Sequence, residues 1–340
     1  MDRRFIPIAS LSLLLAASVV GGSFFLTKSG IFSSEKQRFS GTVAGMSIEK
    51  PAPILEERRD IVSEFQPKKK PGLGTYAVPT AHSAVLLDAA TGMPLFSQDA
   101  DAHRAIASIT KLMTAMIVVE QVKSLDESVT ISEKAVYAEG TRVGCPRSGY
   151  CTGVRLRIGE RVAVRDLLKA ALMNSANDAA IALAEHVSGN QEAFVERMNR
   201  RAVELGLMNT HFCTPSGLEL DDPVAEEGCY SSALDVARIA AYAQRYDVLW
   251  RTMRMEGTVI SSVDGAYRHE IFNTDQMLGY TNLLGTKTGF TPRAGYSLLA
   301  VAADPYDGKH RLVAVVLDDS SRWQSIREMF SWGFSSFEWK

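Results

Sequence analysis

The pattern of hydrophobic and polar positions divides this 340-residue chain into three parts. Residues 5–26 contain no charged side chain, residues 28–80 are mostly polar with five prolines, and apolar and polar stretches alternate from residue 81 onward. Only the third part has the pattern of a folded domain with a buried core. We therefore expect an N-terminal membrane anchor or signal segment at 1–27, a flexible linker at 28–80 and one globular domain at 81–340.

Periodicity within 81–340 predicts strands at both ends of the domain and helices between them. Apolar runs at 84–87 and 93–98 flank a turn, and runs at 295–303 and 311–318 predict two late strands. Helical patterns are found at 109–122, 165–186 with an interruption near 174–175, 191–205, 232–245 and 321–337. This order is typical of an α+β fold, in which an antiparallel sheet is flanked by helices.

The uncharged N-terminal stretch predicts export. Arg3 and Arg4 precede it, which favours an N-terminus inside the cell. Its length is closer to the roughly 20 residues of a spanning helix than to the roughly 7–15 of a cleaved signal. Small residues at 16–18 leave cleavage open. In both cases we expect the domain at the extracytoplasmic face of the bacterial cell membrane, or secreted if the signal is cleaved.

Composition and charge exclude one broad class of function. Lys and Arg number 37 and Asp and Glu 39, so the net charge is -2 and no basic surplus is available for nucleic acid. Hydrophobic residues make up 46% of the chain, which is enough for a sizeable core.

The four cysteines fit an oxidising compartment. Cys145 and Cys151 are six positions apart and Cys213 and Cys229 are sixteen apart, so neither pair has the C-x-x-C spacing of a zinc site. Two local disulfides, Cys145–Cys151 and Cys213–Cys229, are expected in an exported protein. Four cysteines allow three pairings, however, and four reduced, buried thiols are a further alternative.

Candidate chemistry begins with Ser108 and Lys111. On a helix, the Ser-x-x-Lys spacing places the two side chains one turn apart on the same face. A lysine whose pKa is lowered by burial and by a second cation can take the proton of the serine, which then becomes a nucleophile. The spacing alone carries little weight, because it recurs at Ser33–Lys36 and Ser47–Lys50 in the predicted linker.

Two further triplets strengthen this interpretation. Ser175-Ala176-Asn177 interrupts a helical stretch, and Lys287-Thr288-Gly289 precedes a late strand. Ser-x-x-Lys, Ser-x-Asn and Lys-Thr-Gly in this order are typical of β-lactamases and penicillin-binding proteins. Similar triplets at 188–190 and 28–30 carry no weight, because the first is expected to cap a helix and the second adjoins the N-terminal stretch.

On these motifs the chain resembles the low-molecular-mass penicillin-binding proteins, the serine-type D-alanyl-D-alanine carboxypeptidases of peptidase family S11. The matching passages are 107–115, 174–180 and 285–291, with supporting stretches at 205–212, 215–218 and 332–334. The resemblance covers about residues 81–340. It implies a β-lactamase/DD-peptidase-like fold with a helical subdomain, and a DD-peptidase catalytic domain at 81–340.

The resemblance also implies a role for each motif residue. Ser108 would attack the carbonyl of the penultimate D-Ala, Lys111 would take its proton, and Ser175 would relay a proton to the leaving D-Ala. Backbone N–H groups of Ser108 and Phe290 would form the oxyanion hole. Lys287 would lower the pKa of Lys111. The substrate-binding residues would be Asn177, Lys287, Thr288, Gly289, Phe290 and Arg322, with Thr288 and Arg322 on the terminal carboxylate.

The sequence departs from the family pattern in four places. Ala176 stands where glycine is common, and residues 145–151 fall at a loop near the expected cleft. Residues 219–229 form an acidic insertion that either borders the substrate path or is a solvated loop. The family's frequent C-terminal β-domain and amphipathic helix are not expected after 332–334, so the N-terminal segment would attach the protein to the membrane alone.

We therefore expect a penicillin-sensitive carboxypeptidase that removes the terminal D-Ala from peptidoglycan stem peptides and uses no cofactor. β-Lactam antibiotics would be covalent inhibitors, the N-terminal segment would contact the membrane, and nucleic acid would not be a partner. The alternatives are a DD-endopeptidase that cleaves crosslinks, a β-lactamase, and a non-catalytic wall-binding protein of the same fold. A Ser-His-Asp hydrolase and a zinc peptidase are disfavoured, because the motifs G-x-S-x-G and H-E-x-x-H are absent.

Overall fold

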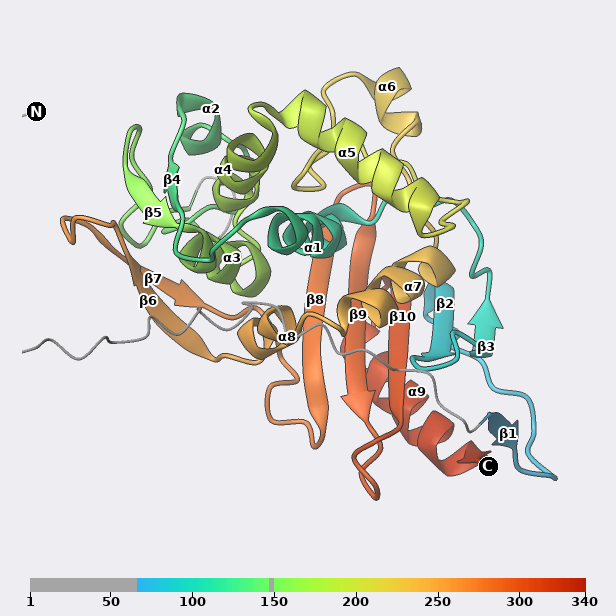
Figure 1. The fold of residues 1–340 in the computed structure, drawn as a ribbon. Coiled ribbons are helices and arrows are strands. Elements are labelled where there is room, and N and C mark those ends of the chain that lie inside the picture. Colours follow the sequence, from blue (N-terminus) through green and yellow to red (C-terminus); the bar gives the residue numbers. More distant parts are fainter. Residues whose placement is uncertain (1–65, 147–149) are drawn as a thin grey trace, which may run out of the picture. The chain divides into compact units, whose positions relative to one another are not determined.

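A five-stranded antiparallel sheet forms the centre of the computed structural model, which describes residues 66–146 and 150–340 (Figure 1). The strand order is β3-β2-β10-β9-β8. The strands are β2 (Ala81–Asp88), β3 (Pro94–Gln98), β8 (Leu283–Thr291), β9 (Gly295–Ala303) and β10 (Arg311–Asp319). The two ends of the domain therefore meet in one sheet, as the early and late apolar runs predicted.

Alternation along the strands divides their side chains between two cores. On β2, Val85 and Leu87 belong to the larger core, whereas Leu86 belongs to the smaller core on the opposite face. Helix α7 (Ala233–Ala243) packs against β2 and β10 on the first face, and α9 (Arg322–Ser336) packs on the second. Because both faces are covered, the central strands are buried throughout most of their length.

A helical subdomain lies at the β8 edge of the sheet (Figure 1). Its helices are α1 (Lys111–Gln121), α2 (Glu133–Val136), α3 (Val164–Met173), α4 (Asn177–Ser188), α5 (Gln191–Glu204), α6 (Pro223–Glu227) and α8 (Asp247–Met253). Two antiparallel pairs accompany them: β4 (Ser128–Thr130) with β5 (Arg161–Ala163), and β6 (Gly257–Ser261) with β7 (Arg268–Phe272). The α+β arrangement with a helical subdomain is thus confirmed.

Most predicted elements are found within a few residues of their expected bounds. The interruption near 174–175 separates α3 from α4, and Gly189 caps α4 in a left-handed conformation with φ of 82°, as expected for the look-alike triplet at 188–190. Lys287-Thr288-Gly289 precedes the late strand β9, as expected, and itself lies in β8, a strand that was not expected. The pairs β4–β5 and β6–β7, which are short and partly exposed, were not expected.

The linker boundary at residue 80 differs from the structure. β1 (Pro67–Lys69) pairs with β11 (Phe337–Trp339), the Tyr76 ring stacks on Trp332 at 4.6 Å, and Val78 is buried. These apolar side chains give residues 66–80 enough buried surface to pack on the domain. The predicted anchor segment and the remainder of the predicted linker lie outside the described residues. Among the residues that are described, no helix is long and apolar enough to cross a membrane.

Candidate active site

Ser108 lies on a short 3-10 turn, η1 (Ala107–Thr110), that leads directly into α1. Ala107 has a φ of 47°, a conformation that costs a non-glycine residue free energy and persists where the surroundings enforce it. Two glycines supply this enforcement. A Cβ on Gly217 would lie 2.0 Å from the Ala107 carbonyl oxygen, and a Cβ on Gly289 would lie 2.7 Å from the Ile106 oxygen. The backbones at Gly217 and Gly289 therefore approach this turn so closely that neither position has room for a side chain.

The Lys111 ammonium lies at the centre of the candidate site. The side chain is fully buried, and Nζ donates to Ser108 Oγ at 2.8 Å, Asn177 Oδ1 at 2.6 Å and the Ser216 carbonyl at 2.7 Å. Burial lowers the pKa of Lys111 well below its ordinary value, and the nearby Lys287 cation lowers this pKa further. Asp178 opposes these two effects. Lys111 is thus positioned and tuned to accept a proton from Ser108.

The segment between α3 and α4 supplies Ser175 and Asn177. Ser175 has a φ of 61°, and its Oγ accepts a hydrogen bond from Lys287 Nζ at 3.0 Å. Ala176, where the family commonly has glycine, has a φ of -65° and is completely buried. Alanine adopts this conformation without strain, so the departure at Ala176 leaves the local backbone intact.

A second buried cation, Lys287, lies opposite Lys111 across this segment. Besides Ser175, its Nζ donates to the Thr288 carbonyl at 3.1 Å. Burial lowers the pKa of Lys287 to about 7, and the Arg322 guanidinium contributes to this shift. Each of the two serines therefore has a buried lysine as its hydrogen-bond partner, Lys111 for Ser108 and Lys287 for Ser175, and burial lowers the pKa of both lysines.

The remaining predicted residues lie in β8, except Arg322, which is the first residue of α9. Thr288 Oγ1 lies 3.1 Å from Thr274 Oγ1, and Arg322 Nη1 donates to the carbonyls of Gly289 at 3.0 Å and Ser297 at 3.2 Å. The exposed Phe290 ring stacks on Tyr296 at 4.6 Å. Arg322 is therefore held against the backbone of Gly289, the residue after Thr288, where its charge favours a nearby anion.

The first disulfide loop is connected to the site through α4. Cys145–Cys151 is formed, and the segment before it contacts the start of α4. Asn177 Nδ2 donates to the Glu139 carbonyl at 2.8 Å, the backbone N–H of Asn177 donates to Thr141, and Asp178 accepts from the Val143 N–H. The segment 139–143, which precedes the disulfide loop, therefore fixes the orientation of the Asn177 amide.

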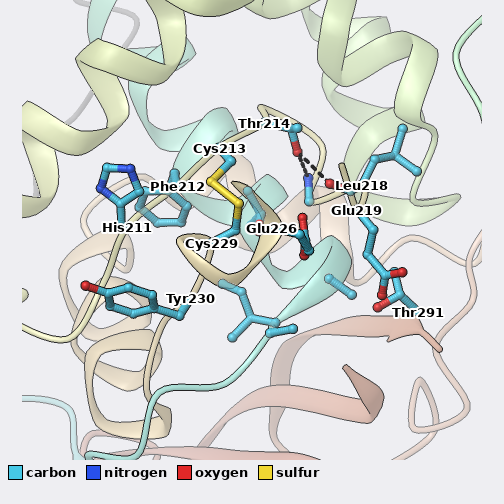
Figure 2. A pocket seen from close by; sticks show the side chains of 15 residues that line it. His211, Phe212, Cys213, Thr214, Leu218, Glu219, Glu226, Cys229, Tyr230 and Thr291 are labelled. Carbon is cyan, nitrogen blue, oxygen red and sulfur yellow. Dashed lines mark hydrogen bonds between the residues drawn. A yellow bond between two sulfur atoms is a disulfide. The ribbon is translucent and has the colours of Figure 1, made fainter. Parts of the chain in front are cut away.

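The second disulfide, Cys213–Cys229, lies in the wall of a pocket beside the Ser108 turn (Figure 2). The acidic segment that it closes is attached to the β8–β9 turn. Arg293 Nη1 contacts Glu226 Oε1 at 2.6 Å, and the Arg293 backbone N–H donates to Glu219 at 3.0 Å. The acidic insertion is thus bound at the edge of the site and is more than a solvated loop.

Several functional contacts were not foreseen from the sequence. Ser216 contributes its carbonyl, and no side-chain motif marks a backbone acceptor. Thr274 lies on the segment after β7 with no recognisable spacing to the motifs. One further cluster, Asp304, Asp307 and His310, has ligand atoms within 4.8 Å of one another. It lies at the β9–β10 turn, at the opposite end of β9 from Tyr296, and contacts none of the motif residues described above.

Comparison with known proteins agrees with this geometry. The peptidase S11 family model, described as D-alanyl-D-alanine carboxypeptidase, matches residues 74–321. The D-alanyl-D-alanine carboxypeptidase DacF of Bacillus subtilis is 34% identical over 267 residues, which cover 76% of this chain and 63% of the relative. The chain therefore spans a little less than two thirds of that relative's length.

Two other similarities bear on activity and fold. A D-alanyl-D-alanine endopeptidase of Pseudomonas aeruginosa is 35% identical over 244 residues, covering 68% of this chain and 70% of the relative. The crystal structure of a D-alanyl-D-alanine carboxypeptidase from Mycobacterium tuberculosis superposes with a TM-score of 0.67 at 27% identity, covering 79% of this chain and 96% of the other.

Proposed function

This chain belongs to the peptidase S11 family of D-alanyl-D-alanine carboxypeptidases, and on that basis we propose that it removes the terminal D-Ala from peptidoglycan stem peptides through an acyl-enzyme on Ser108. One observation supports this proposal above the others. A fully buried lysine, Lys111, contacts the Ser108 hydroxyl at 2.8 Å, and its pKa is lowered. A serine with such a neighbour needs no histidine to become a nucleophile.

In the proposed acylation step, neutral Lys111 takes the Ser108 proton while Oγ bonds to the carbonyl carbon of the penultimate D-Ala. The backbone N–H groups of Ser108 and Phe290 stabilise the oxyanion. The C–N bond to the terminal D-Ala then breaks, and Ser175 relays the proton that Lys111 had taken to the leaving nitrogen, which returns Lys111 to its neutral form. A water molecule then gives a proton to Lys111 and bonds to the ester carbon, the bond to Ser108 Oγ breaks, and Lys111 returns the proton to Ser108.

In the same mechanism the other residues bind substrate or tune the lysine pair. Asn177 holds the substrate backbone amide, and Thr288 and Arg322 bind the terminal carboxylate. Lys287 keeps the pKa of Lys111 low and orients Ser175, which is supported by its 3.0 Å hydrogen bond to that hydroxyl.

Labelled penicillin tests this proposal, because β-lactam antibiotics would acylate the same serine. Mass spectrometry should find one adduct on Ser108 in the wild type and none in Ser108→Ala. Binding of stem peptides without any adduct on the wild type would instead favour a non-catalytic wall-binding protein.

A DD-endopeptidase is the second candidate, because the Pseudomonas aeruginosa endopeptidase is as similar to this chain as the carboxypeptidases are. Incubation with pentapeptide and with crosslinked muropeptide dimers separates the two. Release of free D-Ala supports the carboxypeptidase, whereas conversion of dimers to monomers supports the endopeptidase.

We also propose that the catalytic domain works at the extracytoplasmic face of the membrane, attached through the N-terminal segment. The uncharged stretch after Arg3 and Arg4 supports this, as do two disulfides in the domain. Protease added to intact cells that express the full chain should digest the domain and spare a cytoplasmic marker. Protection of the domain would contradict this location.

A further inference from the structure

Thr274, which the family motifs do not include, places a second hydroxyl beside the one that would bind the substrate carboxylate. Thr274 Oγ1 lies 3.1 Å from Thr288 Oγ1. Thr274 is exposed and Thr288 is half-buried, so both residues are accessible from solvent. The two threonines come from different segments, since Thr288 lies in β8 and Thr274 follows β7.

The segment that carries Thr274 is fixed on the domain. The Thr274 backbone N–H donates to the Met173 carbonyl at 3.1 Å, two residues before Ser175 in the chain. The neighbouring Asn273 amide donates to the carbonyls of Met253 and Met255, each at 2.8 Å. Thr274 is therefore held between the end of α3 and the edge of β8, and little conformational entropy is lost when it binds a ligand.

Both hydroxyls can hydrogen-bond to a ligand in addition to each other. Each threonine hydroxyl has one proton to donate and can accept as well. In the free protein one hydroxyl donates to the other, and Thr274 Oγ1 also lies 3.4 Å from the Met173 carbonyl, which is a long contact. A carboxylate accepts with two oxygens, so it would let both protons form charge-assisted bonds, which are stronger than the hydroxyl–hydroxyl bond they replace.

The charge around this pair suits an anion. Lys287 Nζ reaches the Thr288 carbonyl, and Arg322 is hydrogen-bonded to the adjacent Gly289 carbonyl. Lys287 lies in β8 and Arg322 in α9, and both donate to backbone carbonyls of β8 at or next to Thr288, so a carboxylate bound there would be stabilised by two positive groups.

We propose that Thr274 and Thr288 together bind the terminal carboxylate of the substrate, each donating its hydroxyl proton to a carboxylate oxygen. This inference rests on the proposed carboxypeptidase function and deepens it. Thr274 is then a specificity-determining residue that makes the enzyme select a free C-terminal acid over an uncharged C-terminus.

The test compares Thr274→Val, which keeps the shape and removes the hydroxyl, with Thr274→Ser, which keeps the hydroxyl. Two substrates are used, a peptide ending in D-Ala-D-Ala as the free acid and the same peptide as a C-terminal amide. In Thr274→Val, kcat/KM for the free acid should fall about 10- to 100-fold while that for the amide changes little. Thr274→Ser should stay near the wild type for both substrates.

Thr281→Val, at another exposed threonine, serves as a matched control and should leave both rates unchanged. Melting temperatures of all variants show whether a lost rate reflects lost folding, and Thr274→Ala provides a second hydroxyl-free variant. An unchanged ratio of acid to amide hydrolysis in both hydroxyl-free variants of an active enzyme overturns the role of Thr274 alone. A wild type that forms no Ser108 adduct and releases no D-Ala overturns the proposed function and this inference together.

Discussion

The Cα of Gly217 faces the Ala107 carbonyl so closely that a Cβ at this position would lie 2.0 Å from the oxygen. Gly217 also has a φ of 74°, which disfavours every L side chain. Two residues are positioned by this contact, because Ala107 precedes Ser108, the proposed nucleophile, and Ser216 supplies a carbonyl to Lys111. The geometry of Ser108 and Lys111 therefore depends on an approach that only glycine permits.

Gly217→Ala is expected to lower the free energy of unfolding by about 2–4 kcal/mol, since the left-handed backbone and the overlap with Ala107 both oppose the methyl group. The acylation rate with penicillin should fall as the Ser216 carbonyl moves away from Lys111. Urea denaturation and stopped-flow acylation measure the two effects.

Gly159→Ala is the matched control for this substitution. Gly159 has a φ of 78°, but a Cβ there would meet no atom within 4 Å. The free energy of unfolding should therefore fall by only about 1 kcal/mol, which is the cost of the left-handed backbone, and the acylation rate should not change. Equal effects of the two variants would show that the contact with Ala107 is unimportant.

Lys111→Met should slow acylation of Ser108 by about 10²–10⁴-fold, because a general base contributes a factor of this size. The variant keeps the length of the side chain and removes the group that accepts the proton. Acylation by labelled penicillin measures the effect, and Lys134→Met, at an exposed lysine of α2, is the control. Acylation of a folded Lys111→Met protein at a rate near that of the wild type would refute the role of Lys111 as the base.

Stability should rise with pH between about 7, the pKa of folded Lys287, and 10.5, its ordinary value. Over this interval the unfolded chain binds the proton that the folded protein has lost, so raising the pH favours the folded state. In Lys287→Met this contribution is absent, and the slope of unfolding free energy against pH should decrease by about 1 kcal/mol per pH unit.

Urea denaturation of the wild type and Lys287→Met at several pH values from neutral to moderately alkaline measures this difference. Lys287→Met also removes a cation that lowers the pKa of Lys111, so the difference in slope contains the loss of Lys287 and the smaller pKa shift of Lys111. Identical slopes in the two proteins would mean that folded Lys287 titrates at its ordinary pKa.

The two disulfides should differ in their contribution to stability. Replacing Cys213 and Cys229 by serine opens a loop with a sequence separation of 16 and should cost about 3 kcal/mol. The same change at Cys145 and Cys151 opens a separation of 6 and should cost about 2 kcal/mol. Denaturant titration of both double variants gives the comparison, and a larger loss for the shorter loop would contradict a loop-entropy origin.

Much of the fold could be predicted from the sequence because its main elements are long and have a clear apolar pattern. Strands β9 and β10 are almost continuously apolar, and the largely polar helix α5 buries Phe194, Met198 and Ala202 at four-residue spacing. The pairs β4–β5 and β6–β7 are three to five residues long and partly exposed, so their pattern resembles that of loops. Residues 66–80 were assigned to the linker because prolines and polar residues outnumber Tyr76 and Val78, although these two bury enough surface to fix the segment.

Only those residues of the candidate site that belong to a sequence motif could be predicted. Ser108 and Lys111 are neighbours on one turn, and local spacing is enough to bring them together. The contact between Ser175 and Lys287 depends instead on how α3 and α4 meet the edge of the sheet. The Ser216 carbonyl and the Thr274 hydroxyl have no spacing rule at all, because their positions follow from the packing of loops against the finished fold.

The pairing of β1 with β11 brings the first and last described residues of the chain together. Gln66 and Lys340 exchange backbone hydrogen bonds of 3.2 and 3.4 Å, so the two ends of the described structure adjoin. A short peptide could join these ends without moving any element of the sheet. The domain is therefore suited to circular permutation, in which new ends are opened at a distant surface loop while the Ser108 site keeps its connections.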